Sequence, residues 1–209
     1  MTAAREEMLA RIRAALADAK PVAVVRTYRE RGSLSAKDVV ARFVERVEDY
    51  GAMVIRSPDP ARAVAELLPA RTVVAPDFPV TLRPAGIELL EDDGFTVAEL
   101  DEIDAALTTC AIACAETGSI ALDGGQGQGR RVITLVPDLH ICIVRTGDIV
   151  ETVPELVARL ADSAREGRPI VIVSGPSATS DIELDRVEGV HGPRRLVVVL
   201  HDQLALAAS

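Results

Sequence analysis

The 209-residue chain is poor in aromatic side chains, with no Trp, two Tyr and three Phe. Proteins that hold single-stranded nucleic acid stack the bases on aromatic rings, and this chain has too few rings for such a platform. Acidic residues also outnumber basic ones, which gives a formal net charge of -9 and leaves no excess of cations to neutralise phosphates. We therefore expect no nucleic-acid partner.

Long apolar runs and paired cysteines are missing as well. The apolar runs, such as 196–200, have the length of strands and fall far short of the roughly 20 residues that span a bilayer. Charges stand near the N-terminus, where a signal peptide would be apolar. Cys110, Cys114 and Cys142 all lie in apolar segments, as buried thiols do. We expect a cytoplasmic protein with no membrane span and no disulfide framework.

Aliphatic residues must therefore supply the core. The chain is 48% hydrophobic and 26% charged, a balance typical of soluble globular proteins. A chain of this length buries roughly 70% of its unfolded surface, so it needs neither disulfides nor a structural metal to fold. One domain of ordinary size is the simplest organisation.

The N-terminal segment differs in pattern from the rest. Apolar residues recur at helical spacing over 2–19, which predicts an amphipathic helix that ends before Pro21. The stretch 21–32 is rich in Arg and predicts a connecting arm. We divide the chain into an N-terminal helix and arm, 1–34, and a single α/β domain, 35–209.

Helical and strand patterns alternate from Ser35 onward, which predicts an α/β fold with βαβ units. A strand that begins at Ala106 would place Cys110, Ile112 and Cys114 on one face and alanines on the other. The expected helices cover 35–50, 60–68, 97–104 and 154–165, and the expected strands cover 52–56, 72–75, 86–90, 106–115, 119–122, 132–136, 139–144, 170–173 and 196–200.

A polar loop after the apolar run 169–174 is the first candidate site. We interpret the run as a buried strand, and ligands of α/β proteins usually bind at loops that leave strand ends. The loop gathers hydroxyls, carboxylates and an imidazole. The ligand-binding candidates are Ser177, Thr179, Asp181, Glu183 and His191.

Two interpretations of this loop are open. Ser180 and Glu183 have the spacing of a capping box, which would make the segment simply the start of a helix. Alternatively, the free N–H groups of a helix start and the flanking hydroxyls would bind an anion, such as a small carboxylate or phosphate ligand. Of the three histidines, His191 is the one that we expect to contribute.

The glycine-rich loop 124–131 is a second candidate site. Its glycines let backbone amides approach a ligand, and Arg130 and Arg131 place cations beside it, which suits a phosphate or carboxylate. We name Gly127, Gly129 and Arg130 as ligand-binding candidates. The loop lacks the P-loop pattern, and the strand expected after it excludes a dinucleotide-binding turn. The alternative is a β-hairpin turn with a bulge.

Glu116, at the end of an expected strand, is the candidate catalytic residue. It could act as a nucleophile or general base, or it could only fix the turn. His140 shares a face of an apolar strand with Cys142, and we expect a core histidine bonded to the backbone rather than a metal ligand. Cys110 and Cys114 lack the further cysteines that an iron–sulfur cluster needs. We expect no metal and no cofactor in this chain.

Several blocks of the sequence resemble the LUD-domain family, in its lactate utilisation protein C branch. They cover essentially 106–200, whereas the first hundred residues match only in layout. The longest block is Ser-Gly-Pro-Ser-Ala-Thr-Ser-Asp-Ile-Glu at 174–183, where Ser180 stands in place of a common Ala. The other blocks lie at 115–122, 127–130, 135–137 and 189–193.

The resemblance has implications for fold and function. It implies an open, mostly parallel sheet with helices on both faces, like that of the NagB/RpiA/CoA-transferase group. It also implies work beside iron–sulfur proteins of a complex that oxidises L-lactate to pyruvate, and we expect an accessory or ligand-binding subunit. The alternative, by analogy to the fold group, is an enzyme acting on an acyl or phosphorylated substrate, with Glu116 as nucleophile or base and Arg130 as anion clamp.

Overall fold

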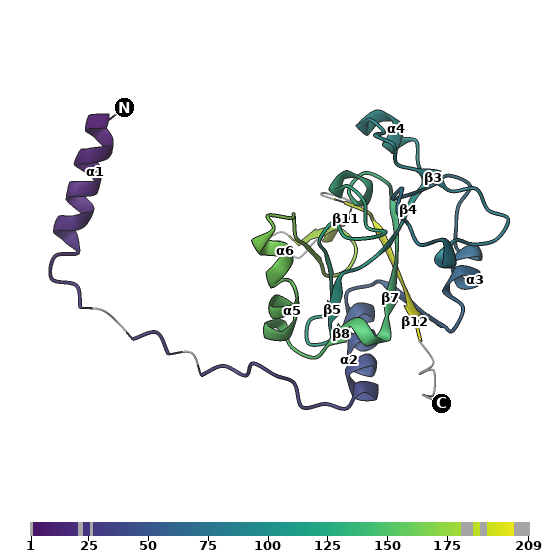
Figure 1. Cartoon of the computed structure of the whole chain (residues 1–209), viewed down its shortest axis with the longest axis horizontal. Coiled ribbons are helices and arrows are strands. Elements are labelled where there is room, and N and C mark those ends of the chain that lie inside the picture. Colours follow the sequence, from purple (N-terminus) through teal and green to yellow (C-terminus); the bar gives the residue numbers. More distant parts are fainter. Residues whose placement is uncertain (1, 21–22, 26, 181–185, 189–191, 203–209) are drawn as a thin grey trace.

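A six-stranded parallel sheet forms the centre of the molecule (Figure 1). The computed structural model describes residues 2–20, 23–25, 27–180, 186–188 and 192–202. All five strand pairings of this sheet are parallel, which confirms the expected open α/β sheet. In sheet order the strands are β1 (Met53–Ser57), β12 (Arg195–His201), β7 (Leu139–Arg145), β4 (Ala105–Thr109), β2 (Thr72–Val74) and β3 (Leu90–Glu91).

Helices cover both faces of this sheet. Helix α2 (Ala36–Asp49) begins where expected, because the Ser35 hydroxyl caps its first turn, and it packs on one face through Phe43. Helix α3 (Pro60–Ala65) packs on the opposite face through Val64. Three short elements complete this part of the fold, namely α4 (Val97–Asp101), η1 (Val80–Leu82) and η3 (Thr146–Asp148).

A second, four-stranded sheet packs on the same face as α2. Ala113 on its inner side joins the buried cluster around that helix. Helix α5 (Val153–Arg159) covers its outer side through Leu156, and α6 (Ala161–Arg165) follows it, so the helix expected over 154–165 is interrupted at Leu160. In sheet order its strands are β8 (Ile149–Val150), β5 (Ile112–Cys114), β6 (Ser119–Leu122) and β9 (Val171–Val173).

The strand expected over 106–115 belongs to two sheets, so this prediction was wrong. The chain leaves the large sheet at the end of β4 and enters the second sheet as β5, after a break at Cys110 and Ala111. The break shifts the alternation of side chains. Cys110 therefore packs with Ala113, whereas Ile112 points to the other side of β5.

Three other expected strands differ in the structure. Of the strand expected over 86–90 only Leu90 is extended, because β3 begins there and continues to Glu91. Residues 132–136 do not extend, because the 3-10 helix η2 (Arg131–Thr134) forms there and its two end residues bond to each other's carbonyl groups. The run 169–174 does form β9, but at the edge of the second sheet rather than in the interior. The Ile172 side chain on β9 is 54% exposed.

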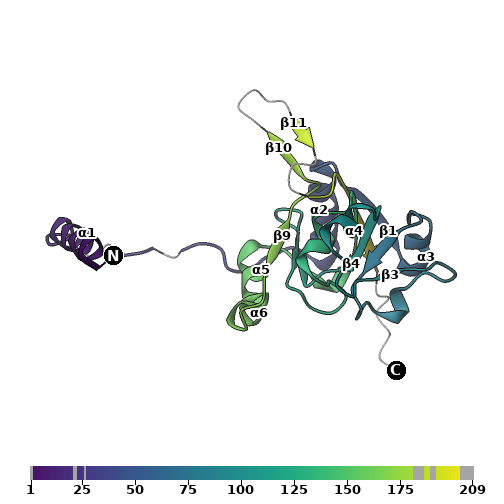
Figure 2. The same cartoon turned by 90° about the horizontal axis from the view of Figure 1, so that it is seen from above.

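The polar segment that follows β9 contains a short hairpin. Strand β10 (Ala178–Ser180) pairs antiparallel with β11 (Arg186–Glu188), and Figure 2 shows the hairpin projecting from the body. The helix start expected after Ser180 falls on 181–185, which lie outside the described residues.

The N-terminal helix α1 (Thr2–Ala15) lies apart from the body at the end of the extended arm (Figures 1 and 2). Its apolar residues, such as Ile12, are exposed. The arm is fastened to the body by the buried Glu151 carboxylate, which accepts the N–H of Ser33 at 2.5 Å and the N–H of Leu34 at 2.7 Å. The domain boundary after residue 34 stays a prediction.

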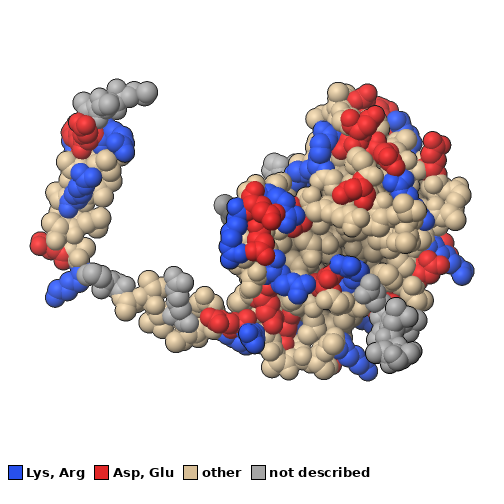
Figure 3. Space-filling view, viewed as in Figure 1, with Lys and Arg blue, Asp and Glu red and all other residues tan. Residues whose placement is uncertain are grey.

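Charges of both signs are mixed over the surface of the molecule that Figure 3 shows. On that face basic side chains do not gather into a continuous patch. Within the described part of the chain, no helix has the length and apolar character needed to cross a membrane.

Candidate functional site

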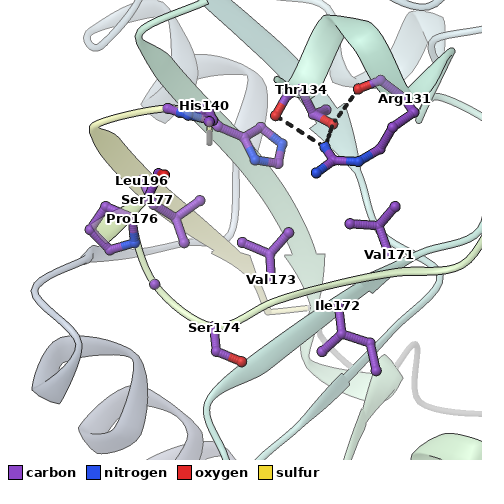
Figure 4. A pocket seen from close by; sticks show the side chains of 13 residues that line it. Arg131, Thr134, His140, Val171, Ile172, Val173, Ser174, Pro176, Ser177 and Leu196 are labelled. Carbon is purple, nitrogen blue, oxygen red and sulfur yellow. Dashed lines mark hydrogen bonds between the residues drawn. The ribbon is translucent and has the colours of Figure 1, made fainter. Parts of the chain in front are cut away.

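A cavity of about 180 Å³ lies between the large sheet and the second sheet (Figure 4). One wall is formed by the first residues of β7 and β12, and the other by β9 and the loop after it. Apolar side chains from β9 and β12 line part of this wall. The polar residues that line the cavity are Arg131, Thr134, His140, Ser174 and Ser177, although the Ser174 hydroxyl points away from His140 and Arg131 (Figure 4).

His140 on β7 supplies a neutral imidazole to this cavity. The residue is 2% exposed, and its Nε2 lies 2.8 Å from the Thr108 hydroxyl on the neighbouring strand β4. Burial, together with the nearby Arg131 guanidinium, lowers the pKa of His140 to about 4. The expected core histidine is thus confirmed as buried, but its partner is a side chain rather than the backbone.

Arg131 supplies a cation at the start of η2. Its guanidinium donates to the Thr134 carbonyl at 3.3 Å and to the Thr134 hydroxyl at 2.8 Å. Burial lowers the pKa of Arg131, yet a guanidinium stays protonated in proteins. Within the described part of the chain Arg131 forms no ion pair with an acidic side chain. A half-buried cation with no counter-ion among the described residues favours an anionic ligand.

Ser174 joins two segments that the sequence singled out separately. Its Oγ lies 2.6 Å from the Oγ of Ser119 on β6, which in turn donates to Thr117 at 2.8 Å. Further along the loop, the Ser177 N–H donates to the Pro193 carbonyl at 2.8 Å. This hydrogen bond joins the two ends of the loop. Ser177, one of the expected ligand-binding residues, therefore lies in the cavity wall.

Gly127 and Gly129 allow neighbouring segments of the chain to pack closely together. At Gly127, with φ +74°, a Cβ would lie 2.9 Å from the Pro79 side chain and 3.0 Å from the Thr109 side chain. Gly129, with φ +68°, packs in the same way against Ile133. Neither belongs to the cavity wall in the described part of the molecule. Their ligand-binding role stays a prediction.

Arg130 forms a two-bonded ion pair with Asp92. Its Nε and Nη2 lie 2.7 and 2.5 Å from the two carboxylate oxygens, and Nη2 also donates to the Phe95 carbonyl at 3.0 Å. Hydrogen bonding to Arg130 holds the pKa of the buried Asp92 below its usual value. The structure thus places Arg130 in a pair with Asp92 and places its neighbour Arg131 in the cavity wall. The anion-clamp role of Arg130 stays a prediction.

Glu116 lies outside this cavity wall as described. Its carboxylate accepts the Val153 N–H at the start of α5 at 3.2 Å and a hydrogen bond from Arg29 of the arm at 3.3 Å. The side chain is 42% exposed. These contacts suit a residue that fixes the turn and caps α5, and the catalytic role of Glu116 stays a prediction.

Four candidate residues cannot be placed in the site. Asp181, Glu183 and His191 lie outside the described residues, and Thr179 is described only by the backbone of β10. In the part of the chain that is described, no three His, Cys, Asp or Glu side chains are grouped as metal ligands.

Thr108, Thr134 and His140 were not predicted as site residues, and Arg130 was predicted rather than Arg131. One signal was present, because an alternating pattern that buries His140 on an apolar strand requires a polar partner for its ring. The identity of that partner depends on which strand lies beside β7, and spacing along the chain does not give it.

Comparisons with known proteins agree with this architecture. The model of the LUD domain matches residues 88–201. Lactate utilization protein C of Deinococcus radiodurans is 46% identical over 202 residues, which cover 94% of this chain and 95% of that protein. A protein of the same name from Halalkalibacterium halodurans is 33% identical over 112 residues, covering 51% of this chain and 48% of that protein.

A solved structure is similar over most of the fold. The crystal structure of a DUF162 family protein from Deinococcus radiodurans superposes with a TM-score of 0.70 at 39% identity, covering 80% of this chain and 99% of that chain. The family model and the relative that aligns along nearly the whole chain lead to the same conclusion. The chain belongs to the LUD-domain family.

Proposed function

We propose that this protein is a component of a lactate utilisation system and that the cavity at Arg131 binds a small carboxylate for that system. The name of the Deinococcus radiodurans relative supports the system, because that protein aligns along nearly the whole chain. The site supports the ligand. Arg131, a cation without an acidic partner in the described part of the chain, carries the proposal.

The chemistry of the cavity suits a short organic acid. A carboxylate accepts two parallel hydrogen bonds from a guanidinium, and such charge-assisted bonds are about twice as strong as neutral ones. Val171, Val173 and Leu196 line the same cavity and exclude water from part of it, which strengthens the attraction. A volume of about 180 Å³ admits an acid of a few carbon atoms.

The finer role that we propose is accessory. Oxidation of a hydroxy acid needs an electron acceptor, and iron–sulfur proteins of the same system would supply it. This chain would bind a small acid of that reaction, either its substrate or its product, while those partners carry out the oxidation. The exposed surface of α1 and the arm would be available for such contacts.

A different cavity favours a second candidate function, an enzyme acting on an acyl or phosphorylated substrate. It has a volume of about 380 Å³ and lies at the carboxyl ends of β4 and β7, beside Gly125 of the glycine-rich loop. Ligands of open α/β sheets often bind at that edge. However, Arg145 and Arg168 in its wall are already paired with Asp148 and Asp123, and the third arginine there, Arg159, is exposed to solvent. The half-buried Arg131 therefore makes the smaller cavity the stronger anion site.

Arg131→Ala tests the proposed site. We expect calorimetric titration of the full chain to show binding of short carboxylates, and the variant to bind them at least about 30-fold more weakly, because a charge-assisted bidentate contact is lost. Arg62→Ala is the matched control, since Arg62 is highly exposed on α3. Equal affinities in wild type and Arg131→Ala would contradict the proposed site.

The same variant tests the role in the cell. A deletion strain supplied with the wild-type chain should grow on lactate and retain the iron–sulfur partners in co-purification, whereas Arg131→Ala should co-purify with them but grow slowly. Normal growth of the deletion strain on lactate would contradict the proposed system.

A further inference from the structure

We infer that the Thr108–His140 pair makes this cavity selective for 2-oxo acids over the matching 2-hydroxy acids. The chain would then bind the oxidised product of a hydroxy-acid oxidation rather than its substrate. The inference rests on the proposed carboxylate site at Arg131 and adds to it the group that recognises carbon 2.

The hydroxyl of Thr108 determines the tautomer of His140. Thr108 is fully buried, and in the described part of the chain its hydroxyl has one hydrogen-bond partner, His140 Nε2 at 2.8 Å. A buried hydroxyl proton that lacks an acceptor is strongly unfavourable. The Thr108 O–H therefore donates to Nε2, which must be unprotonated. A neutral imidazole carries one proton, so that proton is on Nδ1.

The protonated Nδ1 is the ring nitrogen left for a ligand. His140 makes no second side-chain hydrogen bond to the described residues, yet its side chain lines the cavity although the residue is 2% exposed. Figure 4 shows the His140 ring and the Arg131 guanidinium pointing toward one another above Val171 and Val173. The cavity thus presents hydrogen-bond donors from both of these residues.

A 2-oxo acid matches this arrangement because its carboxylate and neighbouring keto oxygen are acceptors only. A 2-hydroxy acid accepts the same bonds more weakly at its hydroxyl and brings a proton that needs an acceptor of its own. The Ser174 hydroxyl points away from His140 and Arg131, toward Ser119 (Figure 4), so water in the cavity would have to accept that proton, and we expect a preference rather than complete exclusion. The expected preference is about tenfold, the factor that one modest hydrogen-bond difference produces.

The selectivity is tested by titrating the full chain with pyruvate, L-lactate and propionate at pH 7.5. We expect pyruvate to bind about tenfold more tightly than L-lactate, with propionate weakest because it has no group on carbon 2. Thr108→Val removes the hydroxyl at nearly constant shape and frees the tautomer, so the preference should fall to about twofold or less. Propionate affinity should not change. Thr108→Ser keeps the hydroxyl and should keep the preference.

A second measurement reads the tautomer without a ligand and remains valid if Thr108→Val folds poorly. Nitrogen-15 NMR of histidine-labelled wild-type protein should show the Nδ1–H form for His140. The Nε2–H form would overturn the inference, and so would equal or tighter binding of L-lactate than of pyruvate, while both results leave the carboxylate site standing. Failure of all three acids to bind would overturn the proposed site and the inference together.

Discussion

Two consecutive arginines, Arg130 and Arg131, differ in role because their side chains have different neighbours. Arg130 neutralises the buried Asp92, and removal of the guanidinium would leave an unpaired carboxylate in the interior. Arg131 donates side-chain hydrogen bonds only to Thr134 in the described part of the chain, and it lines a cavity. The sequence pattern 124–131 predicts cations beside a glycine-rich loop, but it does not tell which of the two is already paired.

At the same residue scale, His140 should make stability depend on pH. Its pKa is lowered to about 4 in the folded state, from about 6.5 when unfolded. Between these values the unfolded chain binds a proton that the folded chain does not, so stability rises with pH across this window. Below pH 4 the free energy of unfolding is lower by about 3 kcal/mol because of this group. Above pH 6.5 the group has no such effect.

Urea unfolding of wild type and His140→Gln at pH 5 and pH 7.5 checks this expectation. The variant should lose less stability than wild type on acidification, because Gln does not titrate. Identical pH dependence in the two proteins would show that His140 is not held neutral.

At the scale of elements, the attachment of the arm to the body depends on Gly32. The Gly32 N–H donates to Glu155 at 3.2 Å, and a Cβ at Gly32 would collide with the Glu151 carboxylate that holds Ser33 and Leu34. The link is local to the start of α5. It should therefore fail without unfolding the sheets.

Gly32→Ala should release the arm. We expect trypsin to cut the arm about tenfold faster, since cleavage follows local opening, while the melting temperature of the body changes little. Gly147→Ala is the matched control, because nothing lies within 4 Å of an added Cβ there. An unchanged rate of arm cleavage in Gly32→Ala would contradict the fastening role of Glu151.

Periodicity predicted the elements that lie in one layer and failed where the chain changes layer. Helix α2 and strands β1, β7 and β12 were expected close to their observed bounds because each stays in one layer along its length. Helix α2 has one apolar face, and β7 and β12 are apolar runs buried on both faces. The split at Cys110 and Ala111 was not predicted, because both halves have strand-like patterns and the pattern does not name the sheet that each half joins. The exposed edge position of β9 was missed for the same reason.

At the scale of the whole molecule, the cavity exists because a small sheet packs against a larger one. The edge strand β9 lies beside the first residues of β7 and β12, and the glycine-rich segment turns back at η2 to place Arg131 between them. These segments are distant in sequence. Sequence alone could therefore single out Ser177, which lies in the cavity wall, but it could not predict that Arg131, Thr108 and His140 would lie near it.

The net charge of -9 makes the role of Arg131 more important, because an acidic protein needs a local cation to hold an acid. The most direct measurement is a crystal structure of the chain grown with pyruvate. We expect the carboxylate of pyruvate on the Arg131 guanidinium and its keto oxygen directed at His140. Pyruvate bound instead in the larger cavity at the carboxyl ends of β4 and β7, with the Arg131 cavity empty, would contradict the proposed site.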